Sequence, residues 1–84
     1  MGDIKMREIK ENTTYRHFKG NVYRVLFIGY DAEHDKDGEM EKLVIYQSNH
    51  DGKILVRSYE NFISKVDKEK YPNADQEYRF EEVD

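Results

Sequence analysis

A β-hairpin pattern occupies residues 14–30, which read TYRHFKGNVYRVLFIGY. Aromatic and β-branched residues at this density favour pleated, half-buried strands. We expect one strand over residues 14–19 and a second over residues 22–30. A two-residue turn at Gly20-Asn21 joins them, because glycine at the first central position accepts a positive φ. The second strand is apolar on both faces, which predicts a central place in a sheet or a bend across a barrel.

The next segments continue this pattern of hairpins. Residues 31–41 are polar and contain Asp37-Gly38, so we expect a long, exposed hairpin tip there. Further strands are predicted over residues 42–48 and 53–57. The turn between them falls at Asp51-Gly52, a pair typical of type I′ turns, which need a positive φ at both central residues.

The C-terminal third contains one predicted helical turn, over residues 58–62. Ser58 is suited to cap it, and Phe62 to close one end of a hydrophobic core. Residues 1–12 are expected to be irregular or to form a short helix. The remaining predictions are a short strand over 63–66, a charged loop over 68–76 and a final edge strand over 77–83.

Length and composition limit the fold to one small domain, residues 1–84. A chain of 84 residues buries only about 60% of its unfolded surface. A doubly wound nucleotide-binding fold and a (β/α)₈ barrel are therefore excluded. The predicted class is mainly β: a small SH3-like, partly open barrel of five to six antiparallel strands with one short helical turn.

The net charge of −4 argues against general binding to double-stranded nucleic acid, which requires surplus Lys and Arg. The charge is uneven, however. Residues 1–30 contain six basic and three acidic residues, whereas residues 31–42 contain two basic and six acidic residues. This uneven distribution leaves room for a local basic face on an acidic protein.

The chain has no Cys, which excludes disulfides, thiolate metal sites and Cys nucleophiles. No apolar run approaches the roughly 20 residues of a membrane helix, and the charged N-terminus has no signal-peptide pattern. The expected location is therefore cytoplasmic, without a membrane partner.

The heptapeptide YRHFKGN at residues 15–21 is the most specific signature in the chain. Further blocks are LVIYQ at residues 43–47, Val56-Arg57, Phe62 and YRF at residues 78–80. On these blocks the chain resembles, over residues 10–82, a family of small bacterial and phage proteins, domain-of-unknown-function family 1653. The resemblance supports the fold and implies no reaction, because that family has no assigned activity. Members usually carry an aromatic residue and a proline where this chain has Leu55 and Ser58.

Metal and cofactor sites are not predicted. Residues 33–38 are similar to the start of an EF-hand loop, but Val44 stands where the loop needs its bidentate carboxylate. The histidines lack the close ligand spacing of a zinc site, and the scattered glycines form no phosphate-binding loop. His17 is the only histidine in a predicted strand, so enzyme action with His17 as general base is the residual catalytic hypothesis.

Recognition is the function that the residue types favour. Arginine offers a planar fork for carboxylate or phosphate, and tyrosine adds a flat stacking surface. We predict a non-enzymatic module presenting an Arg/His/Tyr surface to a protein or peptide partner. The alternative is an oligomeric protein that captures an anionic or nucleotide-like small molecule. A structural role competes at His17 and Arg57, which can fix barrel corners, and at the tyrosines, which can fill the core. The predicted binding residues are Arg16, His17, Lys19, Arg24, Tyr46, Arg57 and Tyr59.

Overall fold

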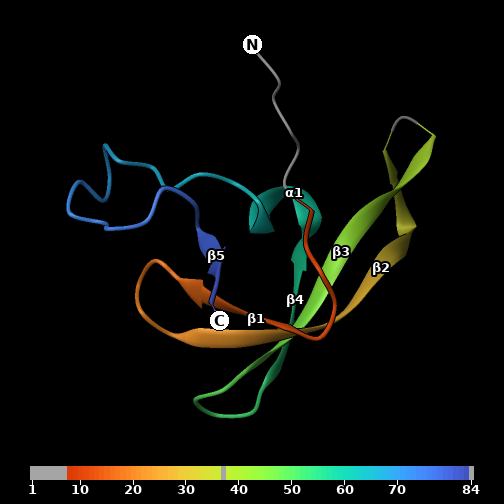
Figure 1. Cartoon of the computed structure of the whole chain (residues 1–84). Helices are drawn as coiled ribbons and strands as arrows, with labels where there is room; N and C mark the ends of the chain where they lie inside the picture. Colours follow the sequence, from red (N-terminus) through yellow and green to blue (C-terminus); the bar gives the residue numbers. More distant parts are fainter. Residues whose placement is uncertain (1–7, 37, 84) are drawn as a thin grey trace.

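One antiparallel sheet curls around a small core in the computed structural model, which describes residues 8–36 and 38–83 (Figure 1). The strand order is β4-β3-β2-β1-β5, so β4 and β5 form the two edges and the barrel is open. The predicted mainly β, partly open fold is confirmed. The elements are β1 (Thr13–His17), β2 (Val22–Lys36), β3 (Glu39–Ser48), β4 (Ile54–Ser58), α1 (Tyr59–Phe62) and β5 (Phe80–Glu82).

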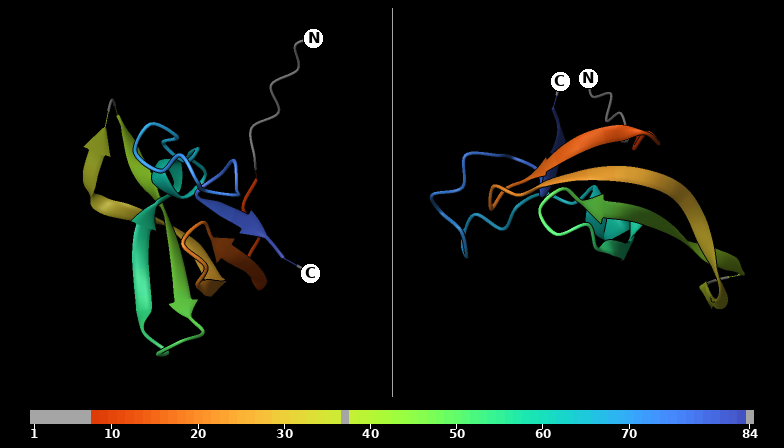
Figure 2. Two further views of the ribbon diagram at one scale, coloured as in Figure 1. Left: turned by 90° about the vertical axis from the view of Figure 1, so that its left-hand side faces the viewer. Right: turned by 90° about the horizontal axis from the view of Figure 1, so that it is seen from below.

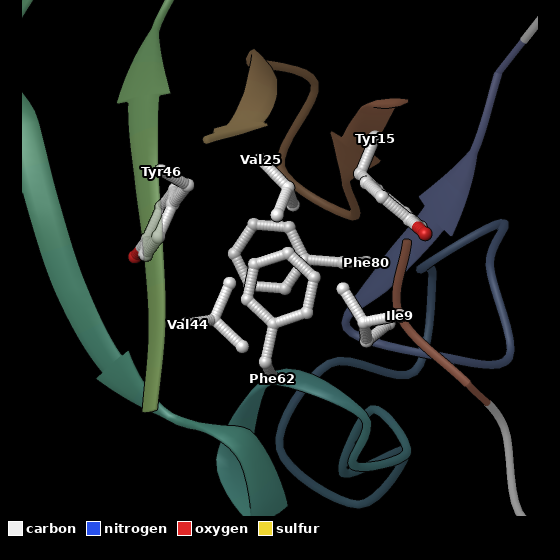
Figure 3. Packing of buried hydrophobic residues seen from close by; sticks show 7 residues of the cluster. All are labelled: Ile9, Tyr15, Val25, Val44, Tyr46, Phe62 and Phe80. Atoms are coloured by element: carbon white, nitrogen blue, oxygen red, sulfur yellow. The ribbon is translucent and has the colours of Figure 1, made fainter. Parts of the chain in front are cut away.

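The core is built on two stacked phenylalanine rings. Phe62 and Phe80 lie parallel with centroids 4.0 Å apart, and both are fully buried. Figure 3 shows this pair at the centre of the cluster. Stacked aromatic rings bury a large apolar area for their number of residues, which a chain this short requires. Around the pair lie Ile9, Tyr15, Val25, Val44 and Tyr46.

The helical turn forms as predicted. The Ser58 hydroxyl accepts a 3.1 Å hydrogen bond from the Asn61 amide and so caps α1. This cap places Phe62 in the core, immediately after β4. β2 lies centrally between β3 and β1, also as predicted.

The first turn is longer than predicted. β1 ends at His17, and the His17 amide donates a 2.8 Å hydrogen bond to the Asn21 carbonyl, so residues 18–21 all belong to the turn. Phe18 is the first residue of this turn. Its amide donates to the Arg79 carbonyl at 3.0 Å, next to the β1–β5 pairing, and its ring contacts the Tyr71 ring at a tilt of 59°. Gly20 has a φ of 110°, which glycine adopts without the steric cost of a Cβ.

The hairpin between β3 and β4 is confirmed, but the predicted type I′ turn is wrong. Only Gly52 has a positive φ, of 75°, whereas the predicted turn needs one at Asp51 as well. The Ser48 hydroxyl accepts hydrogen bonds from the amides of His50 and Asp51. These bonds hold a longer turn over residues 49–53.

The hairpin predicted at residues 31–41 forms, but its tip is shorter than predicted, because β2 continues to Lys36 and β3 begins at Glu39. The polar composition misled the prediction. Figure 1 shows this arm of the hairpin extending beyond the core, where backbone pairing does not require an apolar face. A register shift between Asp31 and Asp35 interrupts the pairing.

The C-terminal strands are shorter than predicted. Of the strand expected over residues 63–66, only a bridge between Lys65 and Tyr78 forms. β5 has three residues and pairs with β1 as an edge strand. Within the predicted irregular segment 1–12, residues 1–7 lie outside the described residues. Ile9 is buried in the core at 6% exposure, which its weak local pattern did not predict.

Candidate functional site

Four cationic or imidazole side chains and two aromatic rings form a continuous surface beside β1. We call it the basic–aromatic surface; its members are Arg57, His17, Phe18, Lys19, Tyr71 and Arg79. The residues come from β1, β4, the turn after β1 and the segment before β5, so the curl of the sheet is what brings them together.

Arg57 is held at one end of the surface by three contacts. Its Nε donates a 2.9 Å hydrogen bond to the Tyr46 hydroxyl, and its Nη1 donates a 2.6 Å bond to the Asn61 side-chain oxygen. The guanidinium also lies 5.3 Å from the centroid of the Phe80 ring. These contacts pre-order a planar cation, which reduces the entropy lost when it binds an anion.

His17 occupies the middle of the surface. Its ring stacks on Phe18 with centroids 4.5 Å apart and meets the Phe80 ring edge-on at 4.9 Å. Burial, together with the nearby charges of Arg57, Arg79 and Lys19, lowers the pKa of His17 from 6.5 to about 4. His17 is therefore neutral at pH 7. Its Nδ1 accepts the Lys19 amide at 3.1 Å, so the ring proton is on Nε2.

Aromatic rings and cations alternate at the other end. Phe18 and Tyr71 lie 4.9 Å apart, and the Lys19 ammonium lies 5.9 Å from the first ring and 5.3 Å from the second. The Arg79 guanidinium lies 5.9 Å from Phe18. A pocket of about 350 Å³ opens here, lined by Phe18, Lys19, Lys70, Tyr71, Pro72, Asn73 and Ala74.

The cations of this surface have no acidic neighbour to neutralise them. In the described part of the chain, Arg57, Arg79 and Lys19 form no ion pair with a carboxylate. Arg57 and Arg79 contact neutral oxygens instead, the latter donating to the Ser64 hydroxyl at 3.1 Å. The surface is therefore positive on a chain whose net charge is −4.

Three of the predicted residues, His17, Lys19 and Arg57, lie together in this surface. Tyr46 is buried at 3% exposure and acts indirectly, by accepting the bond from Arg57. Tyr59 is structural: its hydroxyl accepts the Ile9 amide at 2.9 Å, and Lys42 lies over its ring.

The other two predicted residues lie elsewhere. Arg16 donates a 2.7 Å hydrogen bond to the buried Gln76 and pairs with Asp75 at 3.6 Å, so it anchors the segment before β5. Arg24 is exposed and lies opposite Gln47 in the β2–β3 register. That position points to the outer face of the sheet, because side chains alternate along β2 and its neighbour Val25 is in the core.

Sequence reasoning missed Phe18, Tyr71 and Arg79 as members of the surface. Phe18 was assigned to a strand, although its place beside Gly20 was a signal for a turn. Tyr71 lies in the charged segment predicted as a loop, and Arg79 in a predicted strand. Phe18 contacts Tyr71 and Arg79 across 53 and 61 residues of chain, so no local spacing could reveal these contacts.

Metal-binding clusters and membrane-spanning helices are both absent from residues 8–36 and 38–83. No group of three or more His, Asp or Glu side chains there is arranged to hold a metal ion. No helix in this part of the chain has the length and apolarity needed to cross a membrane.

The fold and this surface define a small, open, five-stranded β protein with an unneutralised basic–aromatic face. Residues 13–82 match the family described as "Protein of unknown function (DUF1653)", and the chain belongs to that family. The resemblance noted in the sequence is thereby confirmed. No match was found among curated proteins or among solved structures.

Proposed function

We propose that this protein is a non-enzymatic binding module that presents the basic–aromatic surface to an acidic segment of a protein partner. The observation that carries the proposal is the convergence of Arg57, Arg79 and Lys19 around a neutral His17. Cations that are held in place by neutral partners can bind a carboxylate favourably, because charge-assisted hydrogen bonds are stronger than neutral ones.

The shape of the surface favours an extended ligand. The cations are spread along a row of rings from Arg57, over Phe80, to Phe18 and Tyr71. An acidic peptide with one apolar or aromatic side chain could place that side chain in the pocket beside Tyr71 and its carboxylates against the arginines. Aromatic and arginine residues are also the ones that dominate protein-binding energetics.

General-base catalysis by His17 receives no support from its surroundings. A base with a pKa of about 4 is weak at neutral pH, whereas efficient general bases have a pKa near the working pH. Nδ1 is also occupied by the Lys19 amide.

A displayed library of random peptides, selected on immobilised protein, tests the proposal. We expect the selected peptides to be enriched in Asp and Glu. We expect the double variant Arg57→Gln/Arg79→Gln to bind them at least about tenfold more weakly, as the loss of charge-assisted hydrogen bonds predicts. Arg24→Gln, on the opposite face, is the matched control and should bind like the wild type.

Two results would count against the proposal. The first is selection of peptides without acidic enrichment; the second is equal binding by the double variant, checked by circular dichroism to be folded. A panel of nucleotides and a short single-stranded oligonucleotide, run on the same proteins, tests the small-ligand alternative. If a nucleotide or the oligonucleotide binds and no peptide is selected, the small-ligand alternative replaces the proposal of a peptide partner.

A further inference from the structure

The outer face of the sheet carries an exposed apolar row. Phe27 pairs with Ile45, and Ile45 pairs with Val56, so these side chains lie side by side across β2, β3 and β4. Phe27 is 63% exposed and Val56 61%. On the same face of β4, Ile54 is 60% exposed. The row ends at β4, which is an edge of the sheet.

The β4 edge carries no Lys, Pro or bulge that would hinder pairing with another strand. The elements that pack closely on β4 are β3 and α1, and Figure 2 (left) shows the strand at one side of the sheet. Natural edge strands are commonly protected by Lys, Pro or a bulge. β4 reads ILVRS and pairs with β3 in unbroken register. Its one charged residue, Arg57, is turned toward Tyr46 and Asn61.

The alternating direction of the backbone along β4 shows which N–H and C=O groups face the free edge. The Lys53 carbonyl accepts the Ser48 amide at 2.9 Å and so faces β3. Because the direction of backbone groups alternates along a strand, Leu55 and Arg57 also face β3. The backbone N–H and C=O groups of Ile54 and Val56, and the N–H of Ser58, therefore face the free edge. The Ser58 carbonyl, as part of the N-cap of α1, accepts the first hydrogen bond of the helix instead.

We propose that two copies of this chain pair through β4, antiparallel, about a two-fold axis at Val56. In that register Val56 lies opposite Val56 of the partner subunit, and Ile54 lies opposite Ser58 of the partner subunit. The Val56 pair can therefore exchange two hydrogen bonds, and the Ser58 N–H can donate a further one to the carbonyl of Ile54 of the partner subunit. The two sheets become one, and the apolar rows of the two copies join at the axis.

Charge and symmetry favour a second copy over other occupants. Arg57 lies opposite Leu55 of the partner subunit, so no like charges face each other, a juxtaposition that destabilises strand pairs. The contact is the same patch on both copies and therefore closes as a dimer. A strand from another protein could use the same backbone groups, but a second copy also brings its own Ile54 and Val56 to the outer face and so extends the apolar row across the axis.

Light scattering after gel filtration, over about a hundredfold range of concentration, tests the pairing, because a dimer dissociates on dilution. We expect the wild type to have the mass of a dimer at the upper end. Val56→Lys places two like charges at the axis and should give a monomer at every concentration. Met40→Lys is the matched control: Met40 is 54% exposed on the far arm of β3, and this variant should remain a dimer.

Hydrogen exchange supplies a second measurement that does not depend on a substitution. The amides of Val56 and Ser58 should become more protected as the protein concentration rises, whereas the amides of Leu55 and Arg57, which face β3, should not change. A wild type that is monomeric throughout, or a Val56→Lys variant that stays dimeric while folded, would overturn the proposal. The monomeric outcome would leave the edge available to a strand of another protein.

This pairing is independent of the proposed binding function. The basic–aromatic surface lies on the inner side of the curled sheet, whereas Val56 points outward. Val56→Lys should therefore still bind the selected acidic peptides, so failure of one proposal does not imply failure of the other.

Discussion

The Nε of Arg57 and the hydroxyl of Tyr46 are joined by a 2.9 Å hydrogen bond that connects the core to the basic–aromatic surface. Tyr46 is buried against Phe62 and Phe80, so its hydroxyl has a fixed position. The bond therefore fixes the direction of the guanidinium, and the core packing determines where the cation lies.

Tyr46→Phe removes this acceptor and leaves the ring in place. We expect the free energy of unfolding to fall by about 1 kcal/mol, the usual net value of one hydrogen bond. Binding of the selected acidic peptide should weaken, because Arg57 loses orientation. Chemical denaturation and fluorescence anisotropy would measure the two effects. Unchanged stability and affinity together would show that the bond does not position Arg57.

The stacked pair of Phe62 and Phe80 predicts a large cost for truncation. Phe62→Ala removes a fully buried ring and should lower the free energy of unfolding by about 3–5 kcal/mol. Tyr30→Ala is the control, since Tyr30 is 62% exposed, and should cost about 1 kcal/mol or less. Urea denaturation of both variants would measure the difference, and equal costs would contradict the described core.

The buried Gln76 predicts a different kind of loss. Its side chain accepts from Arg16 and donates to the carbonyls of Arg16 and Tyr78. Gln76→Leu should destabilise the protein by about 1–3 kcal/mol, because buried partners lose their hydrogen bonds. Asp75→Asn, which weakens only the exposed ion pair to Arg16, should cost about 0.5 kcal/mol or less. Thermal denaturation that ranks the two variants in the opposite order would refute this account.

His17 predicts a pH dependence of stability with a definite sign. Its pKa is lowered from 6.5 to about 4 in the folded protein, so between these values the unfolded chain binds the extra proton. Its contribution to stability is therefore complete above pH 6.5 and is lost as the pH falls through this interval to about 4. Protonation would also break the bond from the Lys19 amide to Nδ1.

The comparison that checks this effect is His17→Gln against the wild type. Denaturation at a series of pH values should show a smaller loss of stability in the variant between pH 6.5 and 4. An NMR titration of the His17 ring should give a midpoint near pH 4. Identical pH profiles for the two proteins, or a midpoint near 6.5, would contradict the described environment of the ring.

Local signals predicted the elements whose cause is local. Ser58 caps the helical turn through a bond to Asn61, three residues away, and the aromatic and β-branched runs identified β2 and β3. The same reasoning failed where the polar or apolar character of a segment did not indicate whether its backbone pairs with another strand. The polar residues 31–36 form strand because backbone hydrogen bonds to the partner strand do not depend on side-chain type. The predicted edge strand over residues 77–83 shortened to three residues for the converse reason, since its length depends on contact with β1.

The predicted binding residues divide in the same way. His17, Lys19 and Arg57 were predicted from residue type and lie together in the basic–aromatic surface. Arg16 has the same chemistry and a neighbouring position, yet it pairs with Gln76 and Asp75, sixty and fifty-nine residues further along the chain. Which arginine is free to bind is therefore a property of distant contacts.

Residue types and their alternation were thus sufficient for the class of fold, the capped turn and the positions of the hairpins, since each depends on interactions within a few residues. The grouping of Arg57, His17, Phe18, Tyr71 and Arg79 was not accessible in this way. It requires the curl of the sheet and the pairing of β5 with β1, which bring together side chains from both ends of the chain. Closing such long loops is driven by burial of the Phe62–Phe80 pair, a tertiary interaction that no local pattern encodes.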